Sequence, residues 1–345
     1  MKFGTFCLIP WREGQDVGQL YRQNLEQAQL AEDLGFDAVW MAEHHFSPYG
    51  TCSAILTYCS NIAARTSRIR IGTAVVVLPF YNPIIIAEEA ATVDQLSGGR
   101  LDLGLGRGYQ AHEFAGVGIP IDESRGRFNE CLEIILQAWT EPAVDFQGKH
   151  YTVPPTSVYP KPAQRPHPPL WIASSASPET LEYAAKRGLP IMAGSTVTVE
   201  TAKRTYGQYH DYLTQYGRTS NGLESMLNRC VYVAESPRDA VDHPEEPMMW
   251  VRDIFNRVGT PAKDGVYPKE YQAWQRRVRD LSYDELVKNV AIFGTPEQCV
   301  ESIRFLEKEL GLGYLMCNMA FGGLDHDKVK RSMTLFAREV MPHFR

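Results

Sequence analysis

The sequence lacks the features that would direct a protein to a nucleic acid or a membrane. Its 345 residues carry a formal net charge of −6, and no run of five or six like charges occurs. Nucleic acids and anionic membranes are bound by clustered Lys and Arg. No apolar run reaches the ~20 residues of a membrane span, and the N-terminus has no signal-peptide stretch. We therefore expect a cytoplasmic protein that binds neither nucleic acid nor membrane.

Regularly spaced cysteines are also missing. The seven cysteines are scattered, odd in number and without a CxxC pair. A disulfide framework or a zinc site would need regular spacing. We expect reduced thiols, most of them buried like small hydrophobic residues, and no metal site.

What is present is a repeating α/β pattern, in which short apolar runs alternate with longer amphipathic stretches. Eight strands are predicted, at Lys2–Pro10, Asp37–Glu43, Arg68–Leu78, Leu101–Gly106, Leu170–Ser174, Leu189–Ala193, Met226–Ala234 and Tyr314–Ala320. This number favours a single (β/α)8 TIM barrel over residues 1–345. The alternative is a doubly wound open sheet, but such a sheet places its glycine loop after the first strand, whereas here it follows the fourth.

Three segments depart from this pattern. Val144–Val153 is predicted as a hairpin, and Leu281–Ile292 as a helix. Residues 235–280, rich in proline and glycine and containing Trp250 and Trp274, predict a long insertion into the barrel. Long loops over barrel mouths commonly gate access, so this insertion is a candidate lid, with a dimer contact as the alternative.

The active site of such a barrel lies at the carboxyl ends of its strands. The second strand ends in AEHHF (42–46). Two adjacent histidines cannot share one face, so His44 and His45 form a poor metal pair, but a histidine there suits proton transfer near neutral pH. The alternative is that they only support a polar loop.

Two further strand ends could bind an anion. GLGRG (104–108) is not followed directly by a helix, as a dinucleotide loop would be, but its glycines allow close ligand approach and Arg107 suits a phosphate. In SSASPET (174–180), Ser177 and Pro178 begin a helix whose free amides favour an anion. Tight packing and a simple helix cap are the alternatives. Because the two strands are neighbours in a barrel, both features could share one dianion.

The stretch AEHHF followed by RIRIGTAVVVLPFYNPIIIAEEAATVDQLSGGRLDLGLGRG resembles the signature of the bacterial-luciferase-like flavin-dependent monooxygenases. The resemblance extends over roughly residues 1–200 and again over the C-terminal tail, and it is poorest at 235–280. In two places the chain departs from the family pattern: Gly106 stands where some luciferases have a reactive cysteine, and Ser174 where an acidic residue is often found.

The resemblance implies roles for specific residues. His44 corresponds to the active-site histidine of the family, and His45 is its neighbour in the same motif. The flavin would lie against a non-prolyl cis peptide between Ala74 and Val75. The implied cofactor-binding residues are Ala74, Val75, Arg107, Gly108, Tyr109, Ser174 and Ser175.

The implied activity is that of an FMN-dependent monooxygenase. Reduced FMN, delivered by a separate flavin reductase, would react with O2 through a C4a-(hydro)peroxyflavin and oxygenate a mainly apolar small molecule. Such a molecule would suit the expected pocket residues Phe6, Trp11, Phe46, Tyr109 and Trp250. A homodimer is also implied. The alternatives are an F420-dependent hydride-transfer oxidoreductase of the same fold and a non-catalytic flavin-binding partner subunit.

Overall fold

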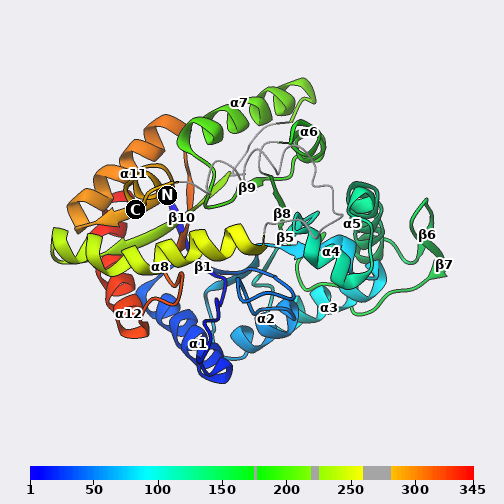
Figure 1. Ribbon diagram of the computed structural model, residues 1–345. Coiled ribbons are helices and arrows are strands. Elements are labelled where there is room, and N and C mark those ends of the chain that lie inside the picture. The colour runs from blue at the N-terminus through cyan, green and yellow to red at the C-terminus, as the bar shows by residue number, and fades with distance from the viewer. Residues whose placement is uncertain (175–176, 219–224, 259–280) are drawn as a thin grey trace.

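Eight parallel strands form a closed barrel at the centre of the protein (Figure 1). The computed structural model describes residues 1–174, 177–218, 225–258 and 281–345. The ring closes because β1 pairs with β12 and β9 pairs with β10. Around the ring the strands are β1 (Lys2–Cys7), β2 (Ala38–Met41), β3 (Arg70–Thr73), β5 (Leu101–Gly106), β8 (Leu170–Ala173), β9 (Ile191–Ala193), β10 (Met226–Val233) and β12 (Tyr314–Asn318). The predicted (β/α)8 barrel and its eight strands are confirmed.

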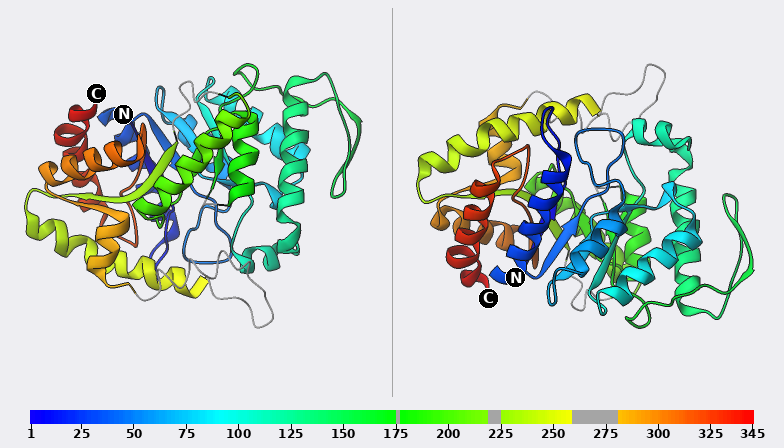
Figure 2. Two further views of the ribbon diagram at one scale, coloured as in Figure 1. Left: turned by 90° about the horizontal axis from the view of Figure 1, so that it is seen from above. Right: turned by 90° about the horizontal axis from the view of Figure 1, so that it is seen from below.

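Helices surround the barrel, and each buries one face against it (Figure 2). The bounds of the first helix follow from local chemistry. The Asp16 side chain accepts a hydrogen bond from the Gln19 amide at its start, and Gly35 ends it with a φ of 80°, which glycine adopts without a Cβ clash. The longer helices are α1 (Val17–Leu34), α2 (Ile55–Ala63), α3 (Pro83–Leu96), α5 (Ser124–Thr140), α6 (Pro178–Arg187), α7 (Val199–Gln215), α8 (Pro237–Val258), α11 (Pro296–Leu310) and α12 (His326–Leu335).

Shorter elements complete the chain. The predicted hairpin is present as β6 (Val144–Gln147) and β7 (Thr152–Thr156), and it projects away from the barrel (Figure 2). The others are β4 (Val76–Val77), β11 (Ala291–Gly294), α4 (Ala111–Val117), α10 (Tyr283–Val290), the 3-10 turns η1 (Leu78–Phe80), η2 (Ile121–Glu123) and η4 (Met341–Phe344), and the π-helical turn η3 (Phe336–Val340).

The insertion predicted at 235–280 is helical over its first half and not the long loop that its prolines suggested. Pro237–Val258 forms α8, a helix that contains Pro244 and Pro247. A proline inside a helix removes one backbone hydrogen bond, which is why the sequence suggested a loop. Both prolines are buried here, with Ala240, Met248 and Ile254 on the same helix, so side-chain packing outweighs that loss. Residues 259–280 of the predicted insertion lie outside the described part of the chain.

The predicted helix at Leu281–Ile292 is too long at its C-terminal end. The helix α10 stops at Val290, and the next four residues form β11, which extends the sheet by pairing in parallel with β10. A capping box at Ser282 and Glu285 fixes the start of the helix.

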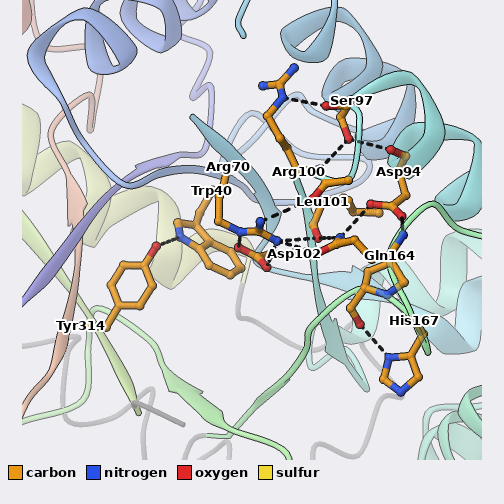
Figure 3. Close-up of polar contacts among 12 residues, drawn as sticks. Trp40, Arg70, Asp94, Ser97, Arg100, Leu101, Asp102, Gln164, His167 and Tyr314 are labelled. Carbon is orange, nitrogen blue, oxygen red and sulfur yellow. Dashed lines mark hydrogen bonds and ion pairs between the residues drawn. The ribbon is translucent and has the colours of Figure 1, made fainter. Parts of the chain in front are cut away.

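Large aromatic side chains pack inside the barrel near the amino ends of its strands, and Figure 3 shows two of them, Trp40 and Tyr314. The Trp40 indole donates a hydrogen bond of 2.9 Å to the Tyr314 hydroxyl, and Trp171 packs edge-on against both rings. Arg70 is the first residue of β3, and its guanidinium forms an ion pair with Asp102 of β5 at 2.7 Å. This layer closes the barrel at the amino ends of its strands, so a ligand must enter from the carboxyl ends.

All seven cysteines are buried and none forms a disulfide, which confirms the prediction of reduced thiols. Burial raises the pKa of each thiol, for example to about 11 in Cys7 and about 12 in Cys230. In the described ranges no helix has the length and apolar character needed to cross a bilayer.

Candidate active site

A cavity of about 720 Å³ opens at the carboxyl ends of the barrel strands. It brings together seven of the nine predicted site residues, which are His44, Ala74, Val75, Arg107, Gly108, Tyr109 and Ser174. His45 does not line the cavity, and Ser175 lies outside the described residues. Of the expected aromatic pocket residues, Phe6 and Tyr109 line it, whereas Trp11, Phe46 and Trp250 do not. Trp250 instead stacks on the Arg12 guanidinium, 5.3 Å from its ring centre.

His44 is held by a buried carboxylate. Its Nδ1 lies 3.0 Å from Glu113 Oε1 and 3.2 Å from the Gln110 side-chain amide nitrogen. Burial alone would raise the pKa of Glu113, but the His44 hydrogen bond and the His45 amide outweigh it and lower that pKa. Glu113 is therefore ionised and accepts the Nδ1 proton, which leaves Nε2 of His44 to exchange a proton with a ligand.

The hydroxyls of two buried tyrosines continue this network. Tyr49 packs edge-on against the His44 ring at 4.7 Å, and its hydroxyl is hydrogen-bonded to that of Tyr109. The Tyr109 hydroxyl also accepts from Gln110 at 3.2 Å. Burial raises the pKa of both tyrosines, so their hydroxyls stay protonated. The histidine ring thus has a fixed orientation.

His45 has a different environment from its neighbour. Its Nε2 lies 2.8 Å from Glu43 Oε1, and the other oxygen of Glu43 accepts from the Val77 amide at 3.1 Å. This pair ties the end of β2 to β4. The Glu43 hydrogen bond raises the pKa of His45, while burial raises the pKa of Glu43 despite that bond. His45 therefore serves to hold the end of β2 against β4, and of the two histidines only His44 faces the cavity.

Stability should fall as the pH rises above 6.5, the ordinary pKa of histidine. Because the folded protein holds the His45 proton to higher pH than the unfolded chain does, the contribution of His45 to stability is fully present below that pH and is lost as the pH rises through the raised pKa of the folded protein. Urea unfolding followed by circular dichroism from pH 6 to pH 9 measures this slope. We expect a shallower slope in His45→Gln than in wild type, and no change in His210→Gln, which replaces an exposed histidine. Equal slopes in wild type and His45→Gln would contradict the assignment.

The cis peptide implied by the resemblance is present between Ala74 and Val75. It forms one wall of the cavity, beside the end of β5. At Gly106, any Cβ would lie 2.4 Å from Val75 Cγ2, so a larger residue there would displace the Val75 side chain. This explains the glycine that stands where some luciferases have cysteine.

Cations and hydroxyl groups gather next to this wall, from the end of β5 to the start of α6. Arg107 and Ser174 line it from the ends of β5 and β8, and Ser177 and Thr180 line it from the start of α6. The Thr180 hydroxyl is buried and has no hydrogen-bond partner among the described residues. The Ser177 hydroxyl donates to Glu179 at 2.8 Å and the Arg125 guanidinium lies 3.5 Å from the same carboxylate, so these two groups pair with Glu179. Arg107, Ser174, Thr180 and the first amides of α6 form a donor set that fits a phosphate at a helix N-terminus.

Sequence reasoning missed four residues of this region. Glu113, Thr180 and Arg204 line the cavity, the last of them from α7, and Arg125 lies next to Ser177. Glu113 lies in α4, a helix that begins at Ala111, whereas the sequence had suggested that no helix directly follows GLGRG (104–108). Nothing in the sequence distinguishes a buried acid from an exposed one. Thr180 could have been noticed, because it lies in the first turn of the predicted anion-binding helix.

The rest of the cavity is mainly apolar. Met248 and Val251 reach it from α8 and Leu286 from α10, so helices beyond the strand ends cover part of its mouth. Phe6 and Met316 line it from β1 and β12. This lining favours a ligand with a mainly apolar body.

Comparison with known proteins places the chain among oxygenases. A family model described as luciferase-like monooxygenase matches residues 1–312. The alkanal monooxygenase alpha chain of the Kryptophanaron alfredi symbiont is 27% identical, over 100% of this chain and 99% of its own length. The oxygenase component of the flavin-dependent trigonelline monooxygenase of Acinetobacter baylyi is 29% identical, over 100% of this chain and 96% of its own.

Solved structures agree with this comparison. The monooxygenase RslO1 from Streptomyces bottropensis has a TM-score of 0.85 and 28% identity, with full coverage of both chains. Two more distant structures share the fold. One is the oxygenating constituent of 3,6-diketocamphane monooxygenase from Pseudomonas putida in complex with FMN (TM-score 0.82, 21% identity, 99% and 98% coverage). The other is an F420-dependent secondary alcohol dehydrogenase (TM-score 0.79, 20% identity, 100% and 99% coverage).

Proposed function

The chain belongs to the luciferase-like monooxygenase family, and we propose that it is an FMN-dependent monooxygenase that oxygenates a mainly apolar small molecule with O2. One observation carries the proposal. A single cavity combines a phosphate-type donor set, a cis peptide wall, and a histidine with a buried carboxylate partner. We propose that a separate flavin reductase supplies the reduced FMN, as the name of the trigonelline relative, an oxygenase component, suggests. A homodimer remains an expectation from the resemblance.

The residues that surround the cavity fit FMN. Arg107, Ser174 and Thr180 would hold the phosphate, and the unpartnered Thr180 hydroxyl is a donor that such a ligand would satisfy. The backbone at Ala74 and Val75 would support the ring. When bound, reduced FMN supplies the two electrons and the carbon centre at which O2 is activated.

The protein itself contributes proton control and exclusion of water. Nε2 of His44 is the nitrogen that remains to give or take a proton, because Nδ1 is held by Glu113. The aromatic layer of Trp40, Trp171 and Tyr314 closes the barrel at the amino ends of its strands. The helices α8 and α10 cover part of the opening at the carboxyl ends. We propose that α8 belongs to the lid predicted from the sequence. A dry cavity limits the loss of activated oxygen as H2O2.

Rapid mixing of the FMNH2-loaded protein with O2, followed by absorbance, tests the proposal. We expect a species that persists longer than in a mixture of free FMNH2 and O2, and whose decay a substrate accelerates. Immediate reoxidation at the rate of free FMNH2 would contradict it. A parallel titration with reduced F420 addresses the alternative, because tight binding of F420 and weak binding of FMN would indicate hydride transfer instead.

Replacing Arg107 with methionine should weaken FMN binding roughly 10- to 100-fold, because a charge-assisted hydrogen bond contributes about 1.5–3 kcal/mol. The affinity for riboflavin, which lacks the phosphate, should stay within about twofold of wild type. Both affinities are measured by fluorescence titration. Equal losses for the two ligands would show that Arg107 does not act on the phosphate. Arg187→Met, which replaces an arginine stacked on Tyr183 outside the cavity, is the control.

A further inference from the structure

Two asparagines line the cavity on the wall opposite the proposed flavin position. Asn228 lies in β10 and Asn318 at the end of β12, and these two strands are neighbours. In the order of strands around the ring, β10 is opposite β3 and β12 is opposite β5. The two asparagines therefore face the cis peptide and Arg107 across the barrel.

Both asparagines are buried with an unsatisfied oxygen. Asn228 is 3% exposed and Asn318 is 5% exposed, and neither Oδ1 has a hydrogen-bond partner among the described residues. The Asn318 amide nitrogen donates to Cys230 Sγ at 3.8 Å, which leaves its oxygen available. Buried acceptors are normally paired, so two in one cavity indicate a ligand that donates hydrogen bonds.

The surroundings of the two amides offer few other donors. In the strand register Asn228 stands beside Met316, and Asn318 stands beside Phe6 and Cys230. Met192, Met248 and Phe321 also line the cavity. A molecule that reaches this wall therefore meets a mainly apolar surface that carries the two side-chain amides.

We propose that Asn228 and Asn318 form a subsite for the substrate, and that the substrate is a mainly apolar molecule that carries a hydroxyl or N–H group. This inference rests on the proposed function and narrows it. An amide oxygen only accepts hydrogen bonds. A plain alkane, aldehyde or ether would leave both oxygens unpaired, and a site built to bind a donor rejects an analogue without one.

A matched pair of probes tests the subsite. 4-Propylphenol has a hydroxyl donor, and 4-propylanisole has the same apolar body without it. Isothermal titration into FMN-loaded protein should show that the phenol binds at least about tenfold more tightly. The preference should disappear in Asn228→Leu and in Asn318→Leu. It should persist in Asn228→Asp and Asn318→Asp, which keep an acceptor oxygen, and in Met316→Leu, which changes an apolar residue of the same wall. Circular dichroism verifies that each variant is folded.

Several outcomes would overturn the subsite. These are equal affinity of the wild type for the two probes, binding of neither probe, and a preference that survives both leucine variants. If the leucine variants lose FMN affinity while the preference remains, the amides bind the flavin and not the substrate. Failure of the wild type to bind FMN would instead contradict the proposed function. In that case the two probes are titrated into the FMN-free protein. This titration tests the subsite independently of the proposed FMN-dependent activity.

Discussion

Replacing His44 with alanine is expected to lower the rate of oxygenation roughly 10²- to 10⁴-fold, the usual contribution of a positioned acid–base group. Affinity for FMN should stay within about twofold of wild type, because the phosphate donors lie on other strands. The rate is measured in single turnovers with the compound that most accelerates decay in the rapid-mixing experiment. The expected loss follows from the geometry, in which Glu113 holds Nδ1 and leaves Nε2 for the proton that the reaction moves.

The matched control for this experiment is His112→Ala. His112 lies in α4, its Nε2 is 3.2 Å from the His45 carbonyl oxygen, and it does not line the cavity. We expect this variant to react within a few-fold of the wild-type rate. Undiminished activity in His44→Ala would favour the alternative of a non-catalytic flavin-binding subunit, because such a subunit has no need of this side chain.

Replacing Gly194 with phenylalanine is expected to weaken FMN binding at least ~100-fold, which corresponds to about 2.7 kcal/mol. Gly194 follows β9 and lines the cavity, and a Cβ built there would meet no atom within 4 Å. Because Gly194 lines the cavity and has open space around that Cβ, a phenyl ring there has room to extend into the volume assigned to the cofactor. Quenching of FMN fluorescence during titration measures the affinity.

Gly207→Phe is the control for the blocked cavity. Gly207 lies on the exposed face of α7, and a Cβ there also meets no atom within 4 Å. The same ring at that position should leave FMN binding within about twofold of wild type, although it can change helix stability. If Gly194→Phe bound FMN as tightly as wild type, the cofactor would have to lie elsewhere.

The barrel could be predicted from the sequence because each of its strands is a short apolar run that a predicted helix or a turn separates from the next. The errors arose where a single local signal was ambiguous. Four residues at Ala291–Gly294 are too few to distinguish a strand from the end of the preceding helix. In α8 the two prolines indicated a loop, and only their burial in the folded protein reveals why a helix forms there.

The site was predictable only in part. The rule that strand ends carry function, together with the family resemblance, led to His44 and Arg107, which both line the cavity. Glu113 was missed because its importance comes from burial against His44, a contact between residues 69 positions apart. Asn228 and Asn318 did carry a signal. Each is a polar residue within a mainly apolar predicted strand, at a position that alternation directs toward the barrel interior.

The seven buried cysteines have a consequence for the durability of an enzyme of this kind. Whenever reduced FMN reacts with O2 without a substrate, hydrogen peroxide forms next to the protein. Peroxide attacks thiolates far faster than thiols, and oxidised cysteine beyond the sulfenic acid is not readily restored. Because burial raises the pKa of each thiol, to about 12 even for Cys230 in the cavity wall, almost no thiolate exists at neutral pH. Wasted turnovers would therefore cost the cell reducing equivalents but leave the sulfur of the catalyst intact.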